Sequence, residues 1–267
     1  MAYRSELIVF TDLDGTLIDH HTYDFAPAAK AIGMLDRMSA GLVLASSKTA
    51  SEIYRLRAEI GCDAWPAIVE NGAGVLPPLV AETSEDTQYL AIRAVLDETP
   101  AELRGLFRGF GDVSTDELMA MTGLSKEGAV LAQSRSFSEP GLWSGTDTER
   151  DQFLTALATH GVTAQQGGRF LTLSFGANKV DQMQKIIQAY NPRYTVALGD
   201  APNDIEMLEY ADIGIIVANP TFPPLPPLRT EGAGRIIRTK QAGPAGWNLA
   251  VCDILERLER EQDLNNG

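Results

Sequence analysis

The chain has few of the features that mark secreted, membrane-bound or metal-thiolate proteins. Its 267 residues include two cysteines, Cys62 and Cys252, which are far apart and not in a metal-binding spacing. We therefore expect free thiols in a reducing cytoplasm. The N-terminus lacks a basic segment followed by a long apolar one, and no apolar run approaches the length of a membrane span. These absences predict a cytoplasmic protein that does not enter a membrane.

Positive charge is also scarce. The chain carries 22 Lys and Arg against 36 Asp and Glu, a formal net charge of −14. Because proteins that bind nucleic acid present a broad basic face to the phosphates, this composition predicts no nucleic-acid partner. An anionic ligand would be repelled by the overall field and would have to be held by local cations.

What the chain does contain is an alternation of apolar strands and amphipathic helices in two separate stretches. The alternation runs from residue 7 to about 75 and returns after Gly176. Such a pattern produces right-handed crossovers and a parallel sheet covered by helices. Pro77-Pro78 and the acidic residues 82–87 mark a boundary, beyond which lie helical patterns and two strands around the turn at Gly167-Gly168. A chain of this length can form two domains, so the sequence predicts an α/β protein with an inserted domain.

Apolar periodicity gives approximate limits for these elements. The expected helices span residues 27–38, 50–60, 89–97, 147–160, 179–190, 203–210 and 247–260. The expected strands span residues 7–10, 41–45, 67–69, 162–166, 170–175, 194–198, 213–217 and 235–238.

Two carboxylates follow the first strand directly. The apolar run of residues 7–10 is typical of a strand buried on both faces, and it is followed by Asp12, Asp14 and Gly15. Gly15 lets the chain turn, so that Asp12 ends the strand and Asp14 lies on the loop above it. Ligands of open α/β sheets bind beyond the carboxyl ends of the strands, where two acids repel each other unless a cation or a shared proton relieves them. The alternative interpretation is a polar loop that caps a buried strand.

Two more acids follow a later strand. The strand at residues 194–198 leads to Asp200, and Pro202 favours a helix start that includes Asp204. Together with Asp12 and Asp14 they make an oxygen-only set of side chains, which is the chemistry that magnesium prefers. The sequence therefore predicts a Mg²⁺ site at this edge of the sheet.

A hydroxyl and a lysine complete the pattern. The strand at residues 41–45 ends in Ser46-Ser47-Lys48-Thr49, whose hydroxyls and backbone N–H groups can hold phosphate oxygens near a helix start. Lys179 begins a helix just after the small residues 176–178. Taken alone, Ser46 would be interpreted as a helix N-cap and Lys179 as a solvated surface residue, but the order of all these groups indicates a common site.

These motifs resemble those of a known superfamily. Asp12-Leu-Asp14-Gly-Thr16, Ser46, Lys179 and Gly199-Asp200 with Asn203-Asp204 look like the four motifs of the haloacid dehalogenase superfamily of phosphohydrolases. Within it, the chain resembles the mannosyl-3-phosphoglycerate phosphatases over most of its length. The stretches that carry this closer likeness are Ser46–Thr49, Glu70–Ala73, Ser136–Pro140, Gly167–Phe170 and Gly243–Trp247.

The resemblance implies a fold and an activity. The fold would be a Rossmann-like parallel-sheet core of residues 1–82 and 176–267, interrupted by an α/β cap of residues 83–175 that closes over the site and determines substrate specificity. The activity would be removal of the phosphate of mannosyl-3-phosphoglycerate through an aspartyl-phosphate intermediate. The product, mannosylglycerate, is a compatible solute.

The resemblance also implies roles for individual residues. Asp12 would be the nucleophile, and Asp14 would protonate the leaving alkoxide and then activate water. Ser46 and Lys179 would bind the phosphoryl group. Many relatives have Thr-Gly-Arg where this chain has Ser46-Ser47-Lys48; serine preserves the donor, but Lys48 lacks the planar fork of arginine.

The metal site implied by the same resemblance uses carboxylates and one carbonyl. Asp12, the backbone carbonyl of Asp14 and Asp200 would bind Mg²⁺ together with several waters. Asp204 would be a water-mediated ligand or would support another ligand.

The leaving group would be recognised mainly by the inserted domain. Its carboxylate calls for a cation, and Arg169 is the first candidate and Arg135 the second, because arginine binds carboxylates bidentately. Glu139 could accept hydrogen bonds from sugar hydroxyls, Trp143 could stack on the sugar, and Asn71 could reach the ligand. The alternatives are an Arg135–Glu139 salt bridge, a core position for Trp143, and a simple Asn-Gly turn at Asn71.

Other functions remain open at this point. The substrate could be glucosyl-3-phosphoglycerate or another sugar phosphate, the enzyme could be a phosphosugar mutase, or the chain could bind ligands without catalysis. The partner expected is a small phosphorylated sugar-glycerate, and the protein is expected to be a monomer or homodimer. His20 and His21 are expected to face solvent, and no pattern nearby suggests a hydrolase triad.

Overall fold

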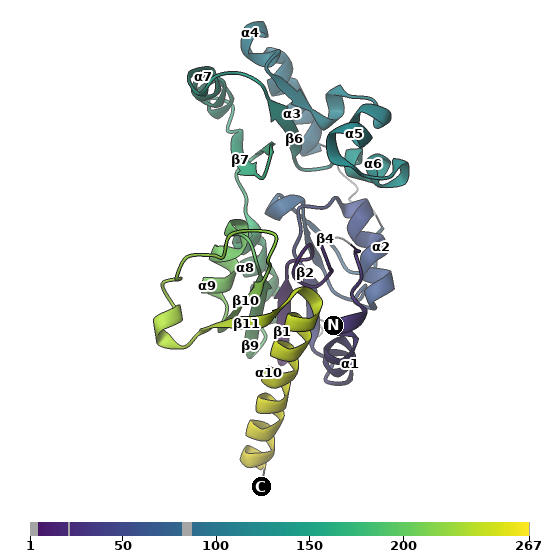
Figure 1. Ribbon diagram of the computed structural model, residues 1–267, viewed down its shortest axis with the longest axis vertical. Helices are drawn as coiled ribbons and strands as arrows, with labels where there is room; N and C mark the ends of the chain where they lie inside the picture. Colours follow the sequence, from purple (N-terminus) through teal and green to yellow (C-terminus); the bar gives the residue numbers. More distant parts are fainter. Residues whose placement is uncertain (1–4, 21, 82–86, 267) are drawn as a thin grey trace. The chain divides into compact units, whose positions relative to one another are not determined.

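The computed structural model describes residues 5–20, 22–81 and 87–266, which form two compact units (Figure 1). Unit 1 comprises residues Met1–Ser46, Arg57–Ile68 and Lys179–Gly267, and unit 2 comprises Ser47–Leu56 and Val69–Asn178. The predicted boundary between residues 82 and 83 falls on residues 82–86, which lie outside the described residues. The predicted domain limits therefore stay a prediction.

A five-stranded parallel sheet forms the centre of unit 1, as the strand–helix alternation predicts. Its strand order is β11-β10-β9-β1-β2. All five positions of β1 are buried, since helices cover the sheet on both faces. The register places Thr11 opposite Leu44 of β2 and Leu198 of β9, so the carboxyl ends of these three strands meet. The strands are β1 (Leu7–Thr11), β2 (Gly41–Leu44), β9 (Tyr194–Gly199), β10 (Ile213–Ala218) and β11 (Ile236–Ala242).

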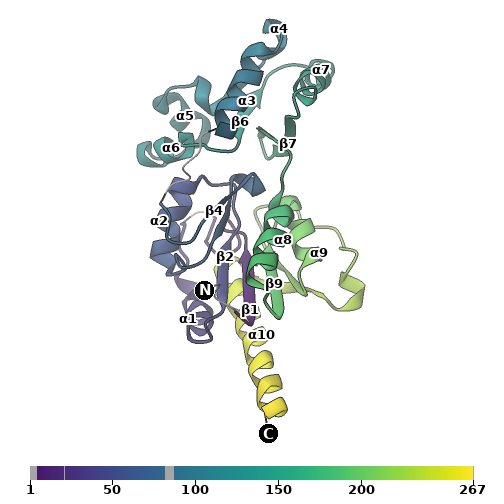
Figure 2. The ribbon, with the colours of Figure 1, turned by 180° about the vertical axis from the view of Figure 1, so that it is seen from behind.

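Helices lie on both faces of this sheet. Figures 1 and 2 show α10 on one face and α8 and α9 on the other, and α10 packs against α1 while α8 packs against α9. Residues such as Phe10, Met183 and Ile216 belong to the buried apolar cluster of this unit. The helices are α1 (Ala29–Arg37), α2 (Ala50–Ile60, divided between the units), α8 (Lys179–Tyr190), α9 (Ile205–Tyr210) and α10 (Gly243–Asn266).

Unit 2 is built on an antiparallel sheet of order β5-β6-β8-β7, with its helices around it and a separate β3–β4 pair. Its main apolar cluster includes Phe107, Phe153 and Leu173, and Trp143 packs on this cluster with its ring 5.0 Å from Phe153. Trp143 is therefore a partly buried residue at the edge of this core. The strands are β3 (Ala67–Val69, divided between the units), β4 (Gly74–Leu76), β5 (Phe107–Gly109), β6 (Glu139–Trp143), β7 (Thr163–Gly167) and β8 (Phe170–Ser174). The helices are α3 (Thr87–Glu98), α4 (Ala101–Arg104), α5 (Thr115–Thr122), α6 (Lys126–Gln133) and α7 (Asp147–Ala158).

The structure confirms the α/β fold and changes a few element limits. α2 and α8 have the predicted ends, and Gly61 has the left-handed φ of +84° expected after α2. α10 begins at Gly243 instead of Trp247, because a proline in the first turn of a helix loses no hydrogen bond. Within residues 5–20, 22–81 and 87–266, no helix combines the length and apolar character of a membrane span.

Candidate active site

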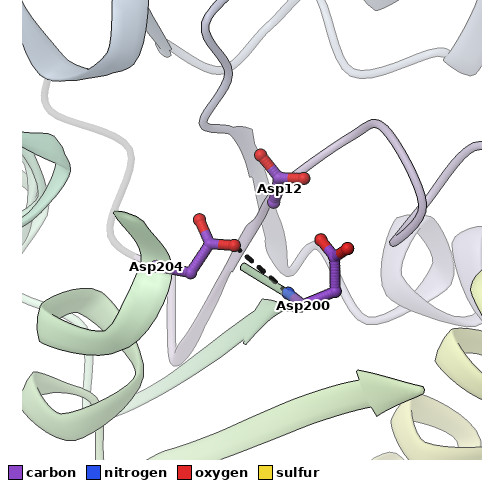
Figure 3. A group of neighbouring side chains, drawn as sticks. All are labelled: Asp12, Asp200 and Asp204. Carbon is purple, nitrogen blue, oxygen red and sulfur yellow. Dashed lines mark hydrogen bonds between the residues drawn. The ribbon is translucent and has the colours of Figure 1, made fainter. Parts of the chain in front are cut away.

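Three buried carboxylates gather where the strands of the parallel sheet end. Asp12 follows β1, Asp200 follows β9, and Asp204 closes the short 3-10 helix that precedes α9. The Asp12 N–H donates to the Leu198 carbonyl at 2.9 Å, which extends the pairing of the two strands. Carboxylate oxygens of the three acids lie within 4.8 Å of one another, and Figure 3 shows how the side chains are grouped. The sheet thus brings together three of the four predicted acids.

Lys179 lies among these acids. Its ammonium donates to Asp12 Oδ1 at 2.6 Å and to Asp204 Oδ1 at 2.7 Å, and the residue is 1% exposed. A solvated surface position, the ordinary expectation for a lone lysine, is therefore excluded. Burial alone would lower the pKa of Lys179, but the charges of Asp12 and Asp204 outweigh that effect and raise it. The lysine is thus held in its charged form.

One ammonium does not balance three carboxylates. Burial raises the pKa of Asp12 to about 8; the charge of Lys179 opposes this rise, while those of Asp204 and Asp200 add to it. Burial likewise raises the pKa of Asp200, against hydrogen bonds from Asn219 and Thr16. The cluster therefore favours an additional positive charge, carried by a proton or a metal ion.

Asp204 has a supporting position. Its Oδ2 accepts the N–H groups of Asp200 and Ala201 at 3.1 Å each, while its Oδ1 receives Lys179. A Cβ at Gly199 would lie 2.5 Å from Asp204 carbon atoms, so this close approach requires glycine. Both oxygens of Asp204 are thus occupied in orienting the loop and the lysine.

Asp200 is fixed by two donors that the sequence analysis did not identify as site residues. Thr16 Oγ1 donates to Oδ1 at 2.9 Å, and Asn219 Nδ2 donates to Oδ2 at 2.6 Å. Asn219 Oδ1 accepts the Thr221 N–H at 3.0 Å, which sets the orientation of its amide. Asn219 follows β10 as Asp200 follows β9, so its place at the carboxyl end of a strand was the available signal.

Asp14 and Ser46 follow the ends of β1 and β2. Asp14 is half-buried and forms an isolated β-bridge with Ile18. The next residue, Gly15, has a φ of +83°, which allows the chain to turn. Among the residues that the structure describes, the group of converging acids does not include the Asp14 carboxylate. Ser46 is 1% exposed just beyond β2, with its N–H donating to the Ile68 carbonyl at 3.0 Å.

A tryptophan far along the chain reaches the backbone of Asp12. Trp247 Nε1 donates to Thr11 Oγ1 at 2.9 Å, and Thr11 Oγ1 donates to the Asp12 carbonyl at 2.8 Å. Trp247 is fully buried in the first turns of α10. The sequence analysis quoted this tryptophan only as part of a resemblance and gave it no role.

Two candidate substrate residues of unit 2 are held in separate ion pairs. Arg135 Nε lies 3.2 Å from Glu70 Oε2, and Arg93 Nη1 lies 3.0 Å from Glu139 Oε1. The suggested Arg135–Glu139 salt bridge is therefore replaced by two different pairs. Glu139 also accepts the Gly111 N–H at 2.8 Å, and burial raises the pKa of Glu139.

The other candidates lie on turns. Arg169 is exposed in the β7–β8 turn, with its guanidinium 5.1 Å from the Phe170 ring centroid. Asn71 has a φ of +59°, and its Nδ2 donates to Gln165 Oε1 at 2.7 Å. His20 is half-buried and its ring meets that of Phe222 edge-on at 5.6 Å, whereas His21 lies outside the described residues.

The acid cluster fits a hard divalent cation. Its donors are oxygens alone, they converge within 4.8 Å, and their charge exceeds that of Lys179. Asp204 accepts the Lys179 ammonium and two backbone N–H groups, whereas each oxygen of Asp200 accepts one uncharged donor. Asp12 and Asp200 are therefore better suited to direct binding. A carboxylate nucleophile next to such a cation is one of the arrangements that supports phosphoryl transfer.

Comparison with known proteins gives a family match over part of the chain and several similar folds. Residues 144–221, which include Lys179, Asp200 and Asp204, match the family model of haloacid dehalogenase-like hydrolases. The sucrose-phosphatase of Synechocystis sp. PCC6803, solved with sucrose and phosphate, is similar with a TM-score of 0.59 at 18% identity, covering 93% of this chain and 98% of its own. The subclass IIB sugar phosphatase BT4131 has a TM-score of 0.61 at 16% identity, covering 92% of this chain and 98% of its own. A Thermoplasma acidophilum protein has a TM-score of 0.64 at 15% identity, covering 95% and 99%.

Proposed function

We propose that this chain is a haloacid dehalogenase-like hydrolase, and that it is a magnesium-dependent phosphatase that converts mannosyl-3-phosphoglycerate to mannosylglycerate and inorganic phosphate. The observation that carries the proposal is the group of three buried carboxylates around the buried ammonium of Lys179. The phosphatase fold of the sucrose-phosphatase and of BT4131 supports a sugar phosphate as substrate. The motif resemblance to mannosyl-3-phosphoglycerate phosphatases supports the particular ester.

The reaction has two halves. In the first, an Asp12 oxygen forms a bond to phosphorus while the bond from phosphorus to the ester oxygen breaks, and Asp14 gives its proton to the leaving alkoxide. In the second, Asp14 takes a proton from water, the water oxygen attacks phosphorus, and phosphate leaves as the Asp12 carboxylate re-forms. Lys179 orients Asp12 through its 2.6 Å contact, and the Ser46 hydroxyl donates a hydrogen bond to a phosphoryl oxygen.

Asp12, Asp200 and the backbone carbonyl of Asp14 would hold Mg²⁺. When bound, the ion neutralises charge on the phosphoryl oxygens and favours the ionised form of Asp12. Thr16 and Asn219 orient Asp200 for this role, and Asp204 orients Lys179. Fixed partners of this kind hold a metal ligand in place before the ion arrives.

Arg169 is our first candidate for the substrate carboxylate. Its side chain is exposed, and among the described residues it forms no ion pair, whereas Arg135 and Glu139 are already paired inside unit 2. A free guanidinium can bind a carboxylate bidentately. Asn71 remains a candidate for a further contact.

The test is phosphate release from purified protein supplied with mannosyl-3-phosphoglycerate, glucosyl-3-phosphoglycerate and several hexose phosphates. We expect turnover of the mannosyl ester to be highest, to vanish with excess chelator and to return with Mg²⁺. Equal, poor turnover of all substrates would overturn the substrate assignment, and an isomerised phosphosugar without free phosphate would indicate a mutase. We expect Asp12→Asn to lower kcat at least about 1,000-fold, because no other carboxylate replaces the nucleophile. Unchanged phosphate release by that variant would contradict the covalent mechanism.

A further inference from the structure

The side chains of Glu70 and Arg135 form a buried ion pair, and both carboxylate oxygens of Glu70 accept hydrogen bonds. Glu70 Oε1 accepts the Ser136 N–H at 2.8 Å, while Oε2 accepts the Phe137 N–H at 3.1 Å and the Ser138 hydroxyl at 2.8 Å. Arg135 lies 3.2 Å from Oε2 and donates through Nη2 to Ser138 Oγ at 2.8 Å. Side-chain exposure is 6% for Arg135 and 0% for Glu70. This guanidinium is thus engaged with partners inside unit 2.

The pair lies where the backbone is strained. Glu70 and Asn71 have φ values of +50° and +59°, a region that residues with a Cβ rarely adopt. Beside them, a Cβ on Gly74 would lie 2.3 Å from the Phe137 ring, so the Phe137 segment packs directly on this turn. A strained conformation of this kind persists only where surrounding contacts stabilise it. Here the hydrogen bonds from residues 136–138 to the Glu70 carboxylate provide those contacts.

The same network reaches the segment that follows Ser46. The Glu70 N–H donates to the Lys48 carbonyl at 2.9 Å, and Arg135 Nη2 lies 3.5 Å from the Ser47 carbonyl. Thr49 Oγ1 donates to the Leu131 carbonyl at 2.9 Å. Residues 47–49, which belong to unit 2, are therefore held at three successive positions, two through backbone carbonyls and one through the Thr49 hydroxyl. A shift of about 1 Å in a positioning group can cost roughly 100-fold in rate, so this anchoring bears on Ser46.

We propose that Glu70 and Arg135 form a positioning pair that holds the Ser46–Thr49 loop and the Asn71 turn in their active conformations. Arg135 then does not bind the substrate carboxylate, contrary to its place as second candidate in the sequence analysis. The inference rests on the proposed function, because it assigns Ser46 to the phosphoryl group.

Two substrates that differ only in their carboxylate distinguish a positioning role of Arg135 from direct binding of that carboxylate. The first is mannosyl-3-phosphoglycerate, and the second is the same ester with its carboxylate converted to a carboxamide. We expect Glu70→Gln and Arg135→Met to lower kcat by about 10- to 100-fold on both substrates in equal proportion. Arg135→Lys should restore part of that loss, since it keeps the charge but not the fork. Arg169→Met should impair the carboxylate substrate selectively. A selective loss with Arg135→Met, leaving turnover of the amide unchanged, would overturn the proposal.

Hydrogen exchange provides a readout that does not depend on activity. In Glu70→Gln and Arg135→Met, we expect faster exchange of the amides of residues 47–50 and 69–74 while the strands of unit 1 keep their protection. Glu127→Gln breaks the exposed Arg55–Glu127 pair of the same unit and serves as the matched control without effect. Unchanged exchange in both loop segments would also overturn the proposal.

The proposal stays testable if a variant does not fold or if the proposed function is wrong. If Arg135→Met does not fold, Ser138→Ala removes one hydroxyl that bridges the pair and should give the same changes in smaller measure. If the wild-type protein hydrolyses neither ester, the proposed function fails, and the exchange experiment alone decides whether the pair fixes these segments.

Discussion

Three carboxylates surround one ammonium in unit 1, whereas the buried acids Glu70 and Glu139 of unit 2 each face an arginine. The acids of both regions are buried, so burial alone does not separate the two regions. The difference lies in the charge balance. The unit 1 cluster keeps an excess of negative charge, while the pairs of unit 2 are neutral as they stand.

Arginines of unit 2 also connect Glu139 to a second acid in a hydrogen-bonded network. Asp112 Oδ1 accepts from Arg93 and from Arg104 at 2.6 Å each, and Arg93 also pairs with Glu139. These hydrogen bonds outweigh the desolvation of Asp112 and lower its pKa. The network therefore contains two acids and two arginines, with backbone N–H groups as further donors.

The comparison of the two regions shows which buried charges are candidates for binding a cation or for catalysis. A neutral, hydrogen-bonded pair holds the chain in one conformation and leaves no capacity for a ligand. A cluster with excess charge is costly unless something else binds, and that cost makes it a candidate for a cation or a reacting group. Substitutions in both units test this distinction.

The largest effect is expected from Lys179→Met. The change removes the ammonium from between Asp12 and Asp204, and breaking a buried pair in this way costs about 3–5 kcal/mol of the free energy of unfolding. We expect Mg²⁺ to recover part of the lost Tm, because the freed carboxylates can bind it. Differential scanning fluorimetry with and without Mg²⁺ measures both quantities.

Arg93→Met is the matched variant in unit 2. It also leaves a buried acid without one partner, but Glu139 is packed against Gly109, where a Cβ would lie 2.1 Å from Oε1. A hydrated ion has no room there, so we expect no recovery of Tm by Mg²⁺. Equal recovery in both variants, or recovery in neither, would remove the distinction between the two regions.

A smaller effect is expected from metal binding to the unaltered protein. Mg²⁺ at 100 times its Kd should stabilise the folded state by about 2.7 kcal/mol. Asp200→Asn should abolish most of this gain, whereas Glu70→Gln, which alters a buried acid of unit 2, should leave it intact. Calorimetric titration of Mg²⁺ into the three proteins provides the affinities. A Tm that does not respond to Mg²⁺ in the wild-type protein would show that the cluster is balanced without a metal.

The acids of the site could be predicted from sequence because they follow strands in a regular way. Asp12 and Asp200 come at the carboxyl ends of apolar runs, where a parallel sheet brings its strand ends together. The partners of Arg135 could not be predicted, because the pairing with Glu70 joins residues 65 positions apart through the path of the inserted segment. The burial of Lys179 could not be predicted for the same reason, because only the folded sheet shows that its helix starts beside Asp12.

The fold of unit 1 was also easier to predict than that of unit 2. Strands buried on both faces are continuous apolar runs, and all positions of β1 and β2 are buried. β6 contains Pro140 and Gly141, residues that weaken the pattern of a strand, and the structure nevertheless pairs it with β5 and β8. Tertiary pairing overrides local preference there, so the antiparallel sheet was only half recognised.

The smallest expected effect concerns pH and Glu139. Burial raises the pKa of Glu139 above its ordinary value of 4.5, so the folded protein keeps a proton that the unfolded chain releases. Between 4.5 and the folded value, the unfolded state binds fewer protons, and this residue's contribution to stability falls as pH rises. Glu139→Gln does not titrate, so its Tm should improve relative to wild type as pH rises from 4 to 7. Glu117→Gln should show the opposite trend, since hydrogen bonds from Ser114 lower the pKa of Glu117 and its stabilising effect is lost on acidification. Parallel Tm profiles for the two variants would mean that unit 2 tolerates its buried carboxylate without cost, and the contrast with unit 1 would then rest on the metal alone.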